Sequence, residues 1–69
     1  MIRVDKLRGI IAQKGMHQSD VARAIGITPK TFYAKMKNGV FGSDEIEAMI
    51  STLDIKDPVD IFFAQKVTL

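Results

Sequence analysis

The chain has 69 residues, which suffice for one hydrophobic core but not for two. It contains no cysteine, so no disulfide or thiolate metal site supports that core, and its longest apolar run, residues 61–64, is much too short to cross a membrane. The net charge of +2 is unevenly divided, because residues 1–42 carry eight basic and two acidic side chains and residues 43–69 carry two basic and six acidic ones. We therefore expect a basic half with a charge of +6 that suits a polyanion, and an acidic half with a charge of −4 that nucleic acid does not cover. The alternative is ordinary solvated charge on helix surfaces.

The chain is expected to form a single domain over residues 1–69 and to stay in the cytoplasm. Its first residues are charged and are not followed by an uninterrupted apolar stretch, so they lack the pattern of a signal peptide. The absence of cysteine fits a reducing compartment. A core this small supplies little stability, which favours self-association.

Two short helices are predicted first, over residues 4–14 and 18–25, because apolar side chains recur at helical spacing and a glycine follows each segment. His17 lies at the N-cap position of the second helix, three residues before Asp20, and we expect it to take part in local capping. A lone histidine without cysteine or clustered acidic partners predicts no metal site. The apolar side chains of these two segments are Val4, Leu7, Ile10, Ile11, Val21, Ala22 and Ile25.

A third helix is predicted over residues 29–38. Thr28 supplies the N-cap, and Pro29 fits the first helical position, where its missing N–H is harmless. Only Gly26 and Ile27 separate the second helix from this cap, so the two helices must turn sharply. A short turn with glycine between two helices describes a helix-turn-helix, whose second helix enters the major groove of DNA.

The remaining chain predicts two more helices, and thus an all-α, compact five-helix bundle in which the second and third helices form the helix-turn-helix. Ser43 is the expected N-cap of the fourth helix, which has carboxylates in its first turn. Asp57 and Pro58 open a short fifth helix that runs through Phe62 or Phe63. The residues from Val67 to Leu69 are expected to form a tail that is either flexible or partner-binding. The apolar stripe of the fourth helix consists of Ile46, Met49, Ile50 and Leu53.

The third predicted helix divides into two faces. Phe32 and Met36 lie on one face and are expected in the core. The opposite face has charge and reach, and its first turn is the part of a recognition helix that meets base edges. The alternative for each lysine on this face is a solvated charge. The complete predicted DNA-binding set is Gln18, Thr28, Pro29, Lys30, Thr31, Tyr33, Ala34, Lys35, Lys37 and Asn38.

The expected roles within this set differ. Lys35 and Lys37 are assigned to phosphate contact or general electrostatic attraction, and Tyr33 to a hydrogen bond with a phosphate. Gln18 opens the second helix, whose N-terminus in this motif faces the phosphate backbone. Methyl groups near the start of the third helix suit contact with a thymine methyl. Direct base readout is assigned to Thr28, Lys30, Thr31 and Ala34.

Residues 18–39 resemble the helix-turn-helix of the phage Cro and lysogenic-repressor type of regulator, also known as the xenobiotic response element family. The resemblance extends downstream, to an acidic fourth helix, an aliphatic link at residues 53–55 and a closing apolar segment at residues 61–63, so it covers nearly the whole chain. A Thr-Phe-Tyr-x-Lys segment followed by Phe41 is similar to small regulators of Gram-positive phages and integrated elements. The positions that match the family pattern are Gln18, Val21-Ala22, Ile25-Gly26 and Thr28.

This resemblance implies a lambda-repressor-like fold, in which the glutamine of the second helix contacts the DNA backbone and the start of the third helix reads bases. It also implies a homodimer on a palindromic operator. The dimer or partner surface that it implies lies in the closing segment, at Ile61, Phe62, Phe63 and Val67.

The leading hypothesis is a stand-alone Cro-like phage or prophage repressor of a lysis–lysogeny switch, which binds double-stranded operator DNA. The alternative is an antirepressor or co-repressor that binds another phage repressor, or an antitoxin-type regulator, and the apolar Phe62-Phe63 pair favours this reading. Neither function needs a cofactor, a small-molecule substrate or a membrane. An enzyme is not expected, because the sequence has no phosphate-binding glycine loop after a strand, and residues 39–42 form the turn between the third and fourth helices with Phe41 packed inward.

Overall fold

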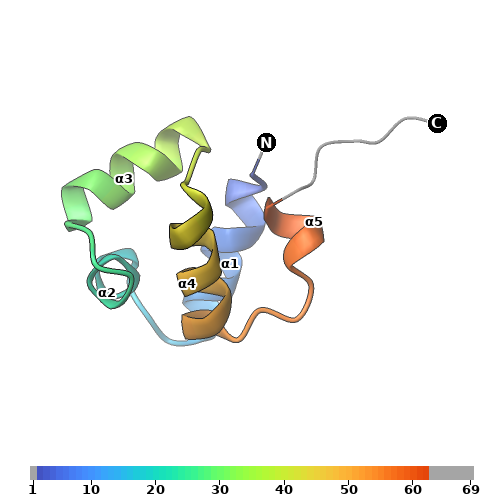
Figure 1. The fold of residues 1–69 in the computed structure, drawn as a ribbon. Coiled ribbons are helices and arrows are strands. Elements are labelled where there is room, and N and C mark those ends of the chain that lie inside the picture. The colour runs from blue at the N-terminus through green and yellow to red at the C-terminus, as the bar shows by residue number, and fades with distance from the viewer. Residues whose placement is uncertain (1, 63–69) are drawn as a thin grey trace.

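The computed structural model describes residues 2–62, which contain five α-helices joined by short turns (Figure 1). Within these residues the fold is all-α, as predicted, and contains no strand. None of the described helices is long and apolar enough to cross a membrane. The predicted tail, Val67 to Leu69, lies outside the described residues. The helices are α1 (Val4–Gln13), α2 (Gln18–Ala24), α3 (Pro29–Asn38), α4 (Ser43–Leu53) and α5 (Pro58–Phe62).

The start of α4 differs from the prediction. We expected Ser43 to cap this helix, but Ser43 is its first helical residue and Gly42 is the N-cap. The backbone N–H of Gly42 donates a hydrogen bond to Oε1 of Glu45 at 2.8 Å. The prediction was wrong because a glutamate at the third helical position reaches back to the cap residue, which leaves no need for a hydroxyl there.

The ends of α1 and α2 each fall one residue earlier than predicted, at Gln13 and Ala24. Lys14 and Ile25 are the C-cap residues, and their N–H groups still bond to carbonyls of the preceding turn, those of Ile10 and Val21. The difference is therefore in the backbone angles of the last residue and not in the extent of hydrogen bonding.

The core draws its fully buried side chains from the first four helices. Phe32 of α3 is fully buried, and its ring lies 5.4 Å from that of Phe41, centroid to centroid, with a tilt of 56°. Phe41 therefore packs inward from the turn after α3, as predicted, and its contact with Phe32 fits the tilted geometry that aromatic pairs prefer. Other fully buried side chains are Leu7 of α1, Val21 of α2, and Met49 and Leu53 of α4.

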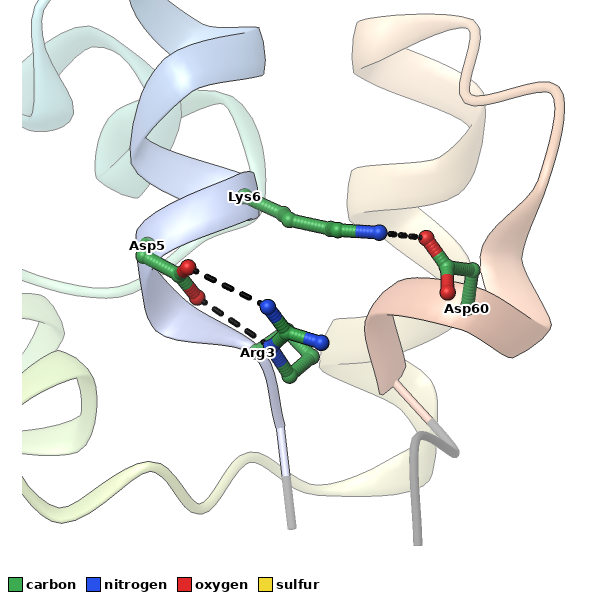
Figure 2. Close-up of polar contacts among 4 residues, drawn as sticks. All are labelled: Arg3, Asp5, Lys6 and Asp60. Atoms are coloured by element: carbon green, nitrogen blue, oxygen red, sulfur yellow. Dashed lines mark hydrogen bonds and ion pairs between the residues drawn. The ribbon is translucent and has the colours of Figure 1, made fainter. Parts of the chain in front are cut away.

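The short helix α5 folds back onto α1. The N–H of Arg3 donates a hydrogen bond to the carbonyl of Ile61 at 2.7 Å, and Lys6 of α1 forms an ion pair with Asp60 of α5 (Figure 2). This docking buries Ile61 and Phe62, each to an exposure of 4%.

The burial of Ile61 and Phe62 corrects the expectation that they form a dimer or partner surface. Both side chains belong to the chain's own core, so their apolar character is explained without a partner. The sequence could not distinguish these uses, because a short helix that covers a core and a helix that covers a partner have the same composition. The other two residues of the predicted surface, Phe63 and Val67, lie outside the described residues.

Candidate nucleic-acid interface

The turn between α2 and α3 is closed by its own backbone. After the C-cap Ile25, the N–H of Gly26 donates to the carbonyl of Arg23 at 3.2 Å, and the N–H of Ile27 donates to the carbonyl of Ala22 at 3.0 Å. This pair of bonds is a Schellman motif, which requires a left-handed residue at the position after the cap. Gly26 takes that conformation with φ of 86°. Because glycine adopts it without strain, the chain reverses within a few residues and α3 packs closely against α2.

Thr28 caps α3 as predicted. Its Oγ1 accepts a hydrogen bond from the N–H of Thr31 at 3.2 Å, and its hydroxyl also donates to the hydroxyl of Thr31 at 2.9 Å. Pro29 follows as the first helical residue. The first turn of α3 is thus fixed by a side chain at its surface, and both threonines are exposed.

The faces of α3 are divided as the sequence predicted. Phe32 and Met36 are buried, with exposures of 0% and 4%. Pro29 is half-buried, and the first turn of the helix has no acidic residue. The structure therefore presents a continuous polar and basic face on α3. Its exposed members are Lys30, Thr31, Tyr33, Ala34, Lys37 and Asn38.

Lys35 is placed differently from the other lysines of α3. Its ammonium lies 3.2 Å from Oε1 of Glu45 on α4, and the two side chains are 33% and 15% exposed. Since the same carboxylate oxygen accepts the N–H of Gly42, this ion pair fastens α3, the following turn and the start of α4 to one another. This contact was not predictable from the sequence, because it depends on the path of the turn between the two helices.

Gln18 is half-buried at the first position of α2. His17 is the N-cap before it, and its backbone N–H donates to Oδ2 of Asp20 at 2.8 Å, so the predicted local capping arrangement is present. The other oxygen of Asp20 pairs with Arg23 at 3.3 Å. Across residues 2–62, no group of His, Asp and Glu side chains is placed to hold a metal ion.

Comparison with known families decides what this arrangement is. A family model described as the Cro/C1-type HTH DNA-binding domain matches residues 6–66, which is most of the chain. The chain belongs to this family. It is a helix-turn-helix regulator that binds double-stranded DNA, with α2 and α3 as the helix-turn-helix. Searches of curated proteins and of solved structures found no match.

Membership of the Cro/C1-type family gives the exposed face of α3 its meaning. In a helix-turn-helix, the second helix enters the major groove and the first crosses the backbone. The DNA contacts of the exposed residues of α3 in this chain stay predictions. Lys30 and Thr31 stand in the first turn of that face, whereas Lys37 and Asn38 stand in its last turn. The two groups are separated along the helix by about 9 to 12 Å, at ~1.5 Å per residue.

Proposed function

We propose that the protein is a Cro-like phage or prophage repressor that binds its operator as a homodimer and blocks a promoter by occupying it. The observation that carries this proposal is the exposed, acid-free first turn of α3, which presents Lys30 and Thr31 beside the capping Thr28. A recognition helix reads bases with its N-terminal residues, so these side chains are in the position where sequence is read.

The chemistry of these residues suggests which base edges they contact. A lysine ammonium donates hydrogen bonds to O6 and N7 of guanine, the commonest specific contact in the major groove. The methyl groups of Thr31 and Ala34 suit the C5-methyl group of thymine. We therefore propose a half-site that contains a guanine opposite Lys30 and a neighbouring thymine. Lys37 and Tyr33, further along the exposed face, contact phosphates.

The test is a fluorescence anisotropy titration with a labelled duplex from the intergenic DNA beside the protein's own gene, with random DNA of equal length as competitor. Lys30→Ala is expected to weaken binding to this duplex by roughly 5- to 150-fold for each protomer that loses a base contact worth ~1–3 kcal/mol. The matched control is Lys56→Ala, because Lys56 is 84% exposed and lies in the link between α4 and α5. Binding of the wild type that is no tighter than its binding to random DNA would count against a sequence-specific repressor.

The antirepressor or antitoxin alternative predicts a different dependence on salt. A dimer that contacts about four to six phosphates loses affinity with a log-log slope of about −4 to −5 against salt concentration, because it releases condensed counterions. For a regulator that acts by binding another protein, the affinity for DNA is expected to change little with salt concentration. The burial of Phe62 in the core removes part of the apolar surface that favoured this alternative.

A further inference from the structure

A cleft of about 490 Å³ lies between the start of α1 and the end of α3. These two helix ends are distant in the sequence and lie at the same end of the molecule (Figure 1). Side chains from both helices line the cleft, including Lys37 and Asn38 from the last turn of α3. The cleft is therefore continuous with the face of α3 that enters the major groove.

The charge of this cleft is positive. Arg3, Arg8 and Lys37 line it, against a single carboxylate, that of Asp5. The guanidinium of Arg3 donates two hydrogen bonds to Asp5, at 3.3 and 3.4 Å, which keep the pKa of that carboxyl below its ordinary value (Figure 2). Asp5 is thus matched with Arg3. Among the described residues, neither Arg8 nor Lys37 takes part in an ion pair, so both retain their charge for a ligand.

Another cleft among the described residues has a different balance of charge. It measures about 450 Å³ and lies between α1, the link after α4, and α5. Its charged side chains are three lysines and three aspartates, so it has no net charge to attract a polyanion. The two clefts share residues of α1, but only the first has a net charge that attracts an anion. The charged residues of the neutral cleft are Lys6, Lys14, Lys56, Asp54, Asp57 and Asp60.

We propose that the basic cleft binds a phosphate of the DNA backbone, so that α1 forms part of the DNA interface together with α2 and α3. This inference rests on the proposed function. The ten residues of α3 give it a length of about 15 Å, and the major groove is about 12 Å wide, so its last turn lies at the edge of the groove when its first turn reads bases. The sugar-phosphate backbone forms that edge, and Arg8 is the residue of α1 whose guanidinium matches phosphate geometry.

The test compares the salt dependence of DNA binding for Arg8→Gln and Lys14→Gln, measured by fluorescence anisotropy on the intergenic duplex and on random duplex of equal length. Each variant removes one positive charge, from α1 at Arg8 or from its C-cap at Lys14, but Lys14 lines the neutral cleft. Arg8→Gln is expected to weaken binding to both duplexes by the same factor and to make the log-log salt slope shallower by about 1 for each protomer that contacts the DNA. Lys14→Gln is expected to leave the slope unchanged, and Arg8→Lys to restore most of it.

Equal slopes for Arg8→Gln and Lys14→Gln would overturn the phosphate contact. If Lys30→Ala then still abolished the preference for the intergenic duplex, the proposed function would stand while the role of the cleft fell. If the wild type bound both duplexes equally and Arg8→Gln still reduced the slope, the sequence-specific function would fall and the cleft would stand. Absence of any DNA binding would overturn both. Thermal unfolding followed by circular dichroism shows that each variant is folded before it is compared.

Discussion

Thr28 is a residue whose single side chain links the local structure of α3 to its proposed use. Its hydroxyl satisfies the N–H of Thr31, one of the groups that a helix leaves without a partner in its first turn. It also holds the hydroxyl of Thr31 at 2.9 Å, so two side chains proposed to face DNA are positioned by one another. A change at Thr28 therefore affects stability as well as recognition.

Thr28→Ala is expected to lower the free energy of unfolding by about 1 kcal/mol, because the Thr31 N–H loses its acceptor. Urea unfolding followed by circular dichroism measures this as a lower midpoint concentration of urea, while the slope of the free energy of unfolding against urea concentration stays unchanged. Thr28→Ser keeps the oxygen and is expected to stay close to the wild type. If Thr28→Ser and Thr28→Ala destabilise the protein equally, the stability depends on the methyl group of Thr28 and not on its capping hydroxyl.

The sequence predicted the positions of side chains that follow helical periodicity better than it predicted ion pairs. Phe32 and Met36 were expected in the core and are buried there, since their spacing alone places them on the face opposite the lysines. The partner of Lys35 was not predictable, because Glu45 lies on another helix. The DNA contacts of the individual residues of α3 remain predictions, and a helical wheel assigns them only to a face.

The helices themselves were predictable because their ends are marked locally. Glycines followed the ends of α1, α2 and α3, and Thr28-Pro29 marked the start of α3. The error at Ser43 has the same local origin, since two neighbouring residues were both compatible with the cap position. The docking of α5 could not be predicted from local sequence. It depends on the hydrogen bond between Arg3 and Ile61, which lie near the two ends of the described chain.

Two glycines, one inside α1 and one just after it, test how the backbone conformation controls this helix, since both have open space around the position of an added Cβ. Gly9 lies inside the helix, whereas Gly15 follows its C-cap with φ of 72°. Gly9→Ala is expected to raise the free energy of unfolding by about 0.5–1 kcal/mol, because alanine restricts the unfolded chain and fits helical angles. Gly15→Ala is expected to lower it by about 1–2 kcal/mol, the cost of the left-handed conformation for an L-residue.

Urea denaturation of the two alanine variants measures both effects against the same wild type. Because neither new methyl group meets another atom within 4 Å, packing does not account for a difference in sign. Similar changes in both variants would show that the backbone conformation at Gly15 does not control the end of α1. In that case the two hydrogen bonds of the Schellman motif would be retained in Gly15→Ala. These bonds run from the N–H of residue 15 to the carbonyl of Ala12 at 3.0 Å, and from the N–H of Met16 to the carbonyl of Ile11 at 3.1 Å.

The uneven charge of the molecule follows the order of the helices. The helices of the helix-turn-helix, α2 and α3, and the basic cleft belong to residues 1–42, which have a net charge of +6, whereas α4 and α5 belong to the acidic part. Much of the acidic charge is already matched, since Glu45, Asp54 and Asp60 each lie in an ion pair. Glu47 and Asp57 are exposed and take part in no ion pair within residues 2–62.

These two carboxylates are expected to disfavour every orientation on DNA except the one that α3 directs. Neutralising them in the double variant Glu47→Gln/Asp57→Asn should raise affinity for random duplex by a few-fold at low salt, since exposed charges act over a Debye length of about 10 Å at ~0.1 M ionic strength. Affinity for the intergenic duplex should rise less, because the proposed complex places α3, and not α4 or α5, in the groove. The ratio of specific to random binding therefore falls.

Anisotropy titrations at two salt concentrations test this against Ser51→Ala/Thr52→Ala, which changes two exposed residues of α4 without changing charge. A gain that persisted undiminished at high salt, or that was as large for the intergenic duplex, would show that the acidic half does not act by repelling DNA.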